Sequence, residues 1–97
     1  MPQKASKQPR TKTKRVRFDL HAPEAQKITL AGNFNWWDVN SLPMKQDRQG
    51  TWKVSVPLEP GRYEYRFWVD GEWKDDPNAQ ERVPNPFGSQ NCVKIVG

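Results

Sequence analysis

The sequence predicts an all-β domain, an antiparallel β-sandwich, and three observations support this fold class. Apolar and polar residues alternate along several short segments, which is the pattern of strands with one buried face. Turn signals separate these segments at regular spacing, as in small sandwiches. No window of about eleven residues has helical spacing free of a proline or another break. A five-stranded barrel is the main alternative.

In the first half of the chain, two short strands precede a long loop. Residues 16–20 read Val-Arg-Phe-Asp-Leu, and the following Pro23 is incompatible with a central strand, so it marks a turn. Residues 27–32 resume the alternation and are expected to place their apolar side chains on one face. Residues 33–44 are rich in asparagine and aromatic side chains and are expected to form a loop.

The second half holds the strongest turn signals. Residues 52–58 alternate again, and Glu59-Pro60-Gly61-Arg62 follows as a tight turn, because proline presets one φ and glycine accepts a positive φ. The longest apolar face lies in residues 63–69, and the Asp70-Gly71 pair after it predicts a hairpin. Residues 74–89 hold three prolines and are expected to be a long loop. With the last apolar run, six or seven short strands are predicted.

Composition divides the chain into a disordered basic tail, residues 1–14, and one folded domain, residues 15–97. Six of the 16 Lys and Arg residues lie in residues 1–15, against none of the 11 acids, so the remainder carries ten cations and 11 acids. The basic charge therefore belongs to the tail, and a fold with a basic nucleic-acid-binding surface is not predicted. The tail either maintains solubility or serves as a linker, or it attracts phosphate-rich partners or an anionic membrane surface.

Several classes of protein and site are not expected. No apolar stretch approaches the roughly 20 residues of a membrane-spanning helix, and the N-terminal segment has no apolar core of a secretory signal. Cys92 is the only cysteine, so no internal disulfide is expected. These observations predict a cytoplasmic protein. His21 is the only histidine, so neither a metal site nor a cofactor is predicted.

Trp37 and Trp73 are the first candidates for a functional site, because each lies just past a turn between apolar runs. A flat ligand has a use for an indole on a loop, and a pyranose ring has a C–H-rich face that stacks on an aromatic ring. The structural alternatives are that Trp37 closes the end of the sandwich and that Trp73 forms a cross-strand pair with Trp68. The adjacent Trp36 is expected to point in a different direction from Trp37, so that one of the two indoles packs while the other stays open.

Arg66 and Asn91 are candidates for the polar contacts of such a site. Arg66 lies on the strand face opposite Tyr65, and its planar set of donors can span two neighbouring hydroxyl groups. It is equally compatible with an ordinary solvated cation that pairs with Glu64 or Glu72. Asn91 offers both a donor and an acceptor, which suits a hydroxyl group. Together with the two tryptophans, these side chains predict a small carbohydrate-binding module.

The carboxylates do not predict an enzyme. Asp75 and Asp76 are adjacent, and Asp70 and Glu72 lie nearby, which raises the possibility of a glycosidase-like acid and base. A polar loop offers no apolar pocket that would raise the pKa of one acid selectively, and the chain is too short to enclose a substrate cleft. A binding function without catalysis is therefore predicted.

From Arg15 to Val96 the sequence resembles carbohydrate-binding module family 48, the early-set modules that include the glycogen-binding domains of AMP-activated protein kinase β subunits and the N-terminal modules of isoamylases and branching enzymes. The matching segments cover nearly the whole domain. They are Leu30-Ala31-Gly32-Asn33-Phe34-Asn35-Trp36-Trp37, then Tyr63-Glu64-Tyr65-Arg66-Phe67-Trp68-Val69-Asp70-Gly71-Glu72-Trp73, Asp76-Pro77 and Gly88-Ser89-Gln90-Asn91.

The resemblance implies an immunoglobulin-like sandwich that binds α-1,4-glucan such as glycogen, starch or maltooligosaccharides. It also implies a glycogen-metabolising enzyme or kinase as a partner in trans. The sugar contacts of the family fall on six positions, which are Trp37, Trp73, Arg66, Phe87, Ser89 and Asn91. Three residues depart from the family pattern: Arg66 replaces a lysine, Phe87 replaces a leucine, and Trp36 stands where small or polar residues are usual.

Two other functions compete with sugar binding. A sandwich of the same fold that no longer binds sugar would dock a protein, with the exposed indoles as anchors. Single-stranded nucleic acid would stack its bases on the aromatic rings while the basic tail follows the backbone, which the charge distribution disfavours.

Overall fold

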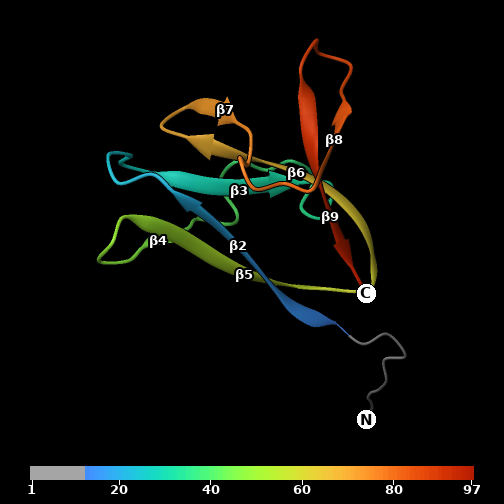
Figure 1. Cartoon of the computed structure of the whole chain (residues 1–97), viewed down its shortest axis with the longest axis horizontal. Helices are drawn as coiled ribbons and strands as arrows, with labels where there is room; N and C mark the ends of the chain where they lie inside the picture. The colour runs from blue at the N-terminus through green and yellow to red at the C-terminus, as the bar shows by residue number, and fades with distance from the viewer. Residues whose placement is uncertain (1–12) are drawn as a thin grey trace.

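The computed structural model describes residues 13–97, which form two antiparallel β-sheets packed face to face (Figure 1). The predicted antiparallel sandwich is confirmed, and the barrel alternative is wrong, because the strands divide into two separate sheets. Residues 1–12 of the predicted tail lie outside the described residues. The first strand begins at Lys14, one residue before the expected start of the domain. Within residues 13–97 no helix is present that would be long and apolar enough to cross a membrane.

The smaller sheet has three strands in the order β2-β5-β4. β2 (Lys14–His21) and β5 (Thr51–Leu58) pair along their whole length, from Lys14 opposite Leu58 to His21 opposite Thr51. β4 (Lys45–Gln46) adds a short edge on the other side of β5. The β2–β5 ladder continues one residue further, where the Ala22 amide donates to the Gly50 carbonyl at 3.0 Å.

The larger sheet is built around β6 (Gly61–Val69), which is paired on both sides. β3 (Ile28–Gly32) and β7 (Glu72–Lys74) pair with its second half, and β9 (Gln90–Val96) pairs with its first half. β8 (Glu81–Pro84) pairs with β9 alone and forms an edge of the sheet. β6 therefore brings segments from distant parts of the chain together.

The segment expected as a loop, residues 74–89, contains β8, and this expectation is therefore wrong for residues 81–84. The Glu-Arg-Val-Pro sequence shows no apolar alternation, and Pro84 argues against a central strand. An edge strand tolerates both features, because one side of it lacks a ladder and its residues are mostly exposed.

The predicted Asp70-Gly71 hairpin is confirmed: both residues have positive φ, 49° and 87°, as a two-residue turn between β6 and β7 requires.

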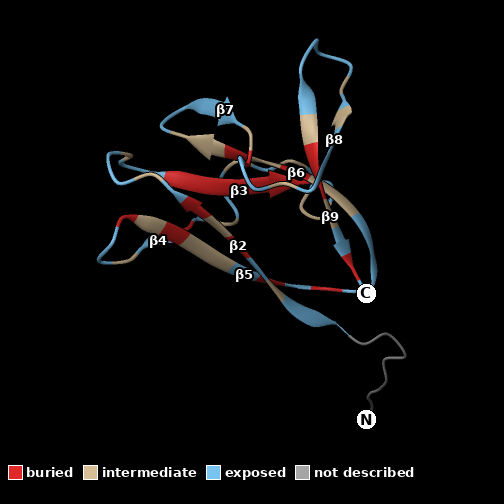
Figure 2. Cartoon of the chain, viewed as in Figure 1, coloured by how far each residue is buried: buried red, intermediate tan, exposed pale blue. Residues whose placement is uncertain are grey.

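The core lies between the two sheets and is supplied by the alternate residues that the period of two predicts (Figure 2). Tyr65 and Phe67 of β6 are 1% and 0% exposed, and Tyr65 contacts Phe18 across the sandwich, with ring centroids 4.9 Å apart. Burying side chains of this size stabilises a fold by about 1.5–3 kcal/mol each. The larger buried apolar residues of the core are Phe18, Leu20, Ile28, Leu30, Met44, Trp52, Val56, Leu58, Tyr65, Phe67, Cys92, Val93 and Val96.

Candidate functional site

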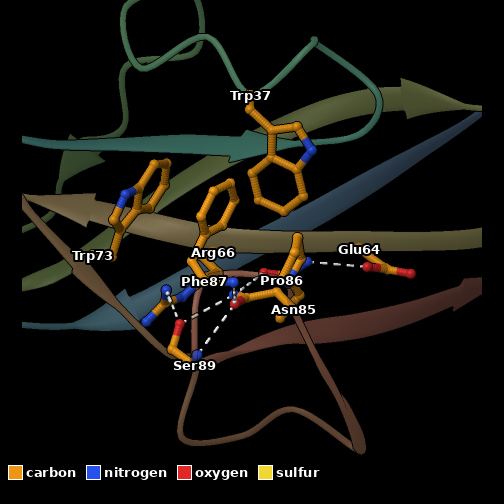
Figure 3. Close-up of a pocket in the computed structure, with 9 residues that line it drawn as sticks. Trp37, Glu64, Arg66, Trp73, Asn85, Pro86, Phe87 and Ser89 are labelled. Carbon is orange, nitrogen blue, oxygen red and sulfur yellow. Dashed lines mark hydrogen bonds between the residues drawn. The ribbon is translucent and has the colours of Figure 1, made fainter.

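The outer face of the larger sheet carries an open cavity of about 490 Å³ (Figure 3). The six residues predicted for a sugar site all line it, although they come from three separate parts of the chain. Three further lining residues were not predicted, namely Glu64, Asn85 and Pro86. Trp37 and Asn91 are 54 residues apart in the sequence, and the pairing of β6 with β3, β7 and β9 brings the lining residues together.

Trp37 is held by a turn that Asn35 organises. The Asn35 Oδ1 accepts a hydrogen bond from the Gly32 amide at 2.9 Å, and its Nδ2 donates to the Asp38 carbonyl at 3.2 Å and to Ser41 Oγ at 2.9 Å. The Trp37 amide donates to the Gly32 carbonyl at 2.9 Å. A Cβ at Gly32 would lie 2.5 Å from the Glu64 carbonyl oxygen, so this tight turn requires glycine there.

Trp36 and Trp37 both have positive φ, 59° and 57°, which is unfavourable for a large side chain. Such backbone strain concentrates at functional sites, where the surrounding structure maintains it. The two side chains have different surroundings: Trp37 is half-buried and lines the cavity, whereas Trp36 is 93% exposed and is not among the lining residues. The expectation that one indole packs while the other stays open is confirmed.

Trp73 on β7 is supported from two sides. Its ring contacts the Trp68 ring edge to face, with ring centroids 4.8 Å apart. On another side, the Trp37 ring centroid lies 6.2 Å away, and the planes of the two rings meet at 80°. The cross-strand pair with Trp68 is therefore present, since the two residues are partners in the β6–β7 register. Trp73 remains 37% exposed, so the pair does not remove its ring from the cavity. Two indoles at a steep angle to each other thus form one wall of the cavity.

Arg66 projects from β6 beneath the indoles, and its guanidinium is fixed by two neighbours. Its Nε donates to Asp75 Oδ1 at 3.0 Å and its Nη1 donates to Ser89 Oγ at 3.0 Å. Its side chain is only 13% exposed, and its guanidinium carbon lies 5.8 Å from the Trp73 ring centroid. The alternative of a solvated cation paired with Glu64 or Glu72 is wrong, because the partner is Asp75. Arg66 is therefore a positioned donor whose charge is balanced.

Asn91 on β9 belongs to a chain of hydrogen bonds across the cavity floor. Its Nδ2 donates to Glu64 Oε1 at 3.0 Å, and its Oδ1 accepts from Asn85 Nδ2 at 3.1 Å. Glu64 also accepts from Arg62 Nη1 at 3.2 Å. These bonds fix the direction of each polar group before a ligand is present. Glu64 shares the outer face of β6 with Arg66, so strand alternation alone would have identified it.

Phe87 and Ser89 lie in the loop between β8 and β9. Phe87 is 89% exposed, and in Figure 3 its ring is seen between the two indoles. Ser89 Oγ contacts Arg66 from the opposite side of the cavity. Asn85, which begins the loop, was not predicted, since an asparagine between two prolines is an ordinary feature of turns.

The adjacent carboxylates do not converge on the cavity. Asp75 pairs with Arg66 on the outer face, whereas Asp76 is 7% exposed and accepts a hydrogen bond from the buried Tyr65 hydroxyl at 2.6 Å. Burial, together with the bond to Asp76, raises the pKa of the Tyr65 phenol. Burial also raises the pKa of the Cys92 thiol, whose Sγ accepts from the Asp76 amide at 3.2 Å. These groups stabilise the interior and are separate from the cavity.

Comparison with known proteins adds a family and several relatives. A family model described as carbohydrate-binding module 48 (isoamylase N-terminal domain) matches residues 4–81. The 1,4-alpha-glucan branching enzyme GlgB of Lactobacillus acidophilus is 40% identical over 83 residues, which cover 80% of this chain and 13% of the enzyme. PTST homolog 2, chloroplastic, of Arabidopsis thaliana is 42% identical over 72 residues, and FLOURY ENDOSPERM 6, chloroplastic, of rice is 40% identical over 72 residues.

The chain thus spans about an eighth of the length of these relatives, 13% in each case. Because the family match ends at residue 81, the part of the cavity formed by residues 85–91 lies outside it. The antiparallel sandwich is the immunoglobulin-like, early-set fold that the family resemblance implied.

Proposed function

Since the chain belongs to carbohydrate-binding module family 48, we propose that it binds α-1,4-glucan in the cavity on the outer face of β6, without catalysis. Carbohydrate binding is the general property of the family, and the residues involved and the particular glucan are our proposal. One observation carries it: six side chains that the family resemblance implies as sugar contacts line a single open cavity. Glycogen, starch and maltooligosaccharides share the repeating unit that such a cavity would recognise.

Aromatic stacking contributes the largest favourable part of the free energy of sugar binding. Trp37 and Trp73 meet at 80°, so their faces follow a bend in the ligand, as the coiled path of an α-1,4-glucan requires. Burying indole against the C–H face of a pyranose contributes roughly 25 cal/mol per Å² of apolar surface. Phe87 extends this apolar surface from the opposite loop. Because hydroxyl groups must be desolvated at the same time, a modest affinity is expected.

Polar groups of the cavity fix the register of the sugar. Arg66, Ser89 and Asn91 each carry donors, and their internal hydrogen bonds hold them in place before binding. The pairing of Arg66 with Asp75 and the presence of Glu64 balance the charge, which suits a neutral ligand better than a phosphate backbone. This charge balance disfavours the nucleic-acid alternative.

The partner proteins and the cellular location also belong to the proposal. One of the relatives named above is an α-glucan branching enzyme, and the other two are chloroplastic proteins. We expect an enzyme of glycogen or starch metabolism, or a kinase, as a partner in trans. A cytoplasmic location stays a prediction that rests on the composition of the chain.

Titration with maltoheptaose or β-cyclodextrin tests the proposal directly, because Trp37 and Trp73 report on the cavity through their fluorescence. Saturable quenching or enhancement is expected for the parent protein. Trp37→Ala and Trp73→Ala should each remove most binding to glycogen in an affinity gel while the protein stays folded. Trp36→Ala is the matched control, because it removes the same side chain from outside the cavity and should bind as the parent does.

A protein-docking module of this fold predicts no fluorescence change with any glucan. If the parent shows none, or if the Trp37 and Trp73 variants bind glycogen like the parent, the proposed site is wrong.

A further inference from the structure

The loop of residues 85–89 is organised by one side chain, that of Asn85. Its Oδ1 accepts hydrogen bonds from the Phe87 amide at 2.9 Å and the Ser89 amide at 3.2 Å. Its Nδ2 donates to Ser89 Oγ at 3.0 Å and to Asn91 Oδ1 at 3.1 Å. Asn85 is half-buried, and these four bonds connect it with the other polar lining residues of this part of the chain, Ser89 and Asn91.

The backbone of residues 85–89 also favours an ordered loop. The Asn85 amide donates to the Ser89 carbonyl at 3.0 Å, and Gly88 has a φ of 82°, a conformation that suits glycine. Prolines on both sides of Asn85 restrict the backbone further. Yet the loop lies at the tip of the β8–β9 hairpin, which projects from the sheet (Figure 1), and Phe87 is 89% exposed. Core packing therefore contributes little to its order, and local hydrogen bonds must supply it.

The bonds at Ser89 also determine what that residue offers a ligand. Its Oγ accepts from Arg66 Nη1 and from Asn85 Nδ2, each at 3.0 Å. A hydroxyl oxygen has two lone pairs, so both are engaged and the hydroxyl hydrogen is directed elsewhere. Ser89 is thereby set as a hydrogen-bond donor at the cavity.

We propose that Asn85 is a positioning residue, which holds Phe87 and Ser89 in the binding geometry before the sugar arrives. This inference rests on the proposed function and deepens it. Ordering a loop on binding costs conformational entropy, so a loop that is already ordered avoids that loss. In the loop that carries Trp37, the Asn35 side chain likewise accepts from a backbone amide and donates to neighbouring oxygens.

The test compares Asn85→Ala with the parent by maltoheptaose titration and by NMR measurement of amide exchange with water. We expect the Kd of Asn85→Ala to rise about tenfold, because an ordered loop must then form on binding. The amides of Phe87 and Ser89 should exchange at least about tenfold faster, because their acceptor is gone. Asn85→Asp keeps an acceptor for both amides and should recover part of the affinity. Asn78→Ala, an exposed asparagine outside the cavity, is the matched control and should change neither quantity.

A second arm separates positioning from direct contact with the sugar. In a Phe87→Ala, Ser89→Ala, Asn91→Ala background, Asn85→Ala should change the Kd by less than about twofold, because the three side chains that it holds are absent. An undiminished loss in that background would mean that Asn85 binds the sugar itself, and the proposal would be wrong. Parent-like affinity of Asn85→Ala would also overturn it.

If the chain does not bind α-glucan at all, the experiments give a different result. In that case the parent itself does not bind maltoheptaose, while amide exchange still decides whether Asn85 holds the loop. Unchanged exchange at Phe87 and Ser89 in Asn85→Ala would then reject the positioning role as well. All variants should keep the melting midpoint of the parent, since the substituted side chains lie outside the core.

Discussion

The two faces of β6 differ in what their side chains do, although the residues alternate along one strand. Tyr65 and Phe67 point inward and are almost completely buried, whereas Glu64 and Arg66 point outward and line the cavity. The Tyr65 ring contacts Phe67 on the same face and Phe18 across the sandwich. The outer residues make hydrogen bonds to the loops that surround the cavity. The period of two therefore lets one strand supply both the fold and the site with little interference.

The adjacent acids after β7 repeat this division. Asp75 faces outward and neutralises Arg66, while Asp76 faces inward and accepts from Tyr65. Neighbouring residues in extended backbone point to opposite sides, so a shared catalytic role is geometrically excluded for this pair. Substitutions on the inner face should lower stability and those on the outer face should lower affinity.

Phe67→Ala should give the largest effect, a decrease in the free energy of unfolding of about 3–5 kcal/mol, because it opens a cavity at a position that is 0% exposed. Phe87→Ala removes the same ring from a position that is 89% exposed and should change stability by less than about 0.5 kcal/mol. Urea denaturation followed by circular dichroism measures both. Similar losses for the two variants would contradict the division between the faces. If Phe67→Ala does not fold, Phe67→Leu provides a milder test on the same side.

Tyr65→Phe should destabilise the protein by about 1–3 kcal/mol, because the buried Asp76 carboxylate loses the donor at 2.6 Å. Tyr63→Phe is the matched control: its hydroxyl donates to the Glu59 carbonyl at an exposed position, so a smaller loss is expected. The midpoints of urea denaturation for the two variants give the comparison. Neither should alter glucan affinity, and a weaker Kd for folded Tyr65→Phe would show that the inner face also shapes the cavity.

Arg66→Lys should lower affinity for maltoheptaose about three- to tenfold while stability stays within about 1 kcal/mol of the parent. Lysine keeps the charge and loses the planar group that joins Asp75 to Ser89, so Ser89 would no longer be held from that side. Isothermal titration and thermal melting measure the two quantities. Unchanged affinity would mean that the charge alone, and not the geometry of the guanidinium, serves the site.

Much of the fold follows from local sequence patterns. The alternation in residues 63–69 identified the strand that became β6, and the Asp70-Gly71 pair identified its hairpin. β8 was missed because an edge strand needs no apolar alternation and is paired only by its backbone with β9. The cavity-lining tryptophans were found because an indole after a turn has no evident use in the core, and the resemblance to the family added Phe87 and Ser89.

The remaining parts of the site depend on tertiary neighbours that no local pattern specifies. Glu72 was a plausible partner for Arg66 by distance along the strands, but the turn after β7 brings Asp75 to the guanidinium instead. Asn85 had no signal, because its role arises from bonds to residues whose positions are set by the β8–β9 register. Which polar side chains hold others in place is therefore learned only from the assembled structure.

Glucan affinity should be almost independent of salt, and this is the smallest effect expected on the outer face. An increase from about 50 to about 500 mM salt should change the Kd for maltoheptaose by less than about twofold, because a neutral ligand releases no counterions. The charge of Arg66 is already balanced by Asp75, so screening removes little from the cavity. The same titration with a short single-stranded oligonucleotide provides the contrast, since any binding through unpaired cations should weaken steeply over that range. A strong loss of glucan affinity with salt would place the binding energy in charged contacts rather than in the stacked indoles.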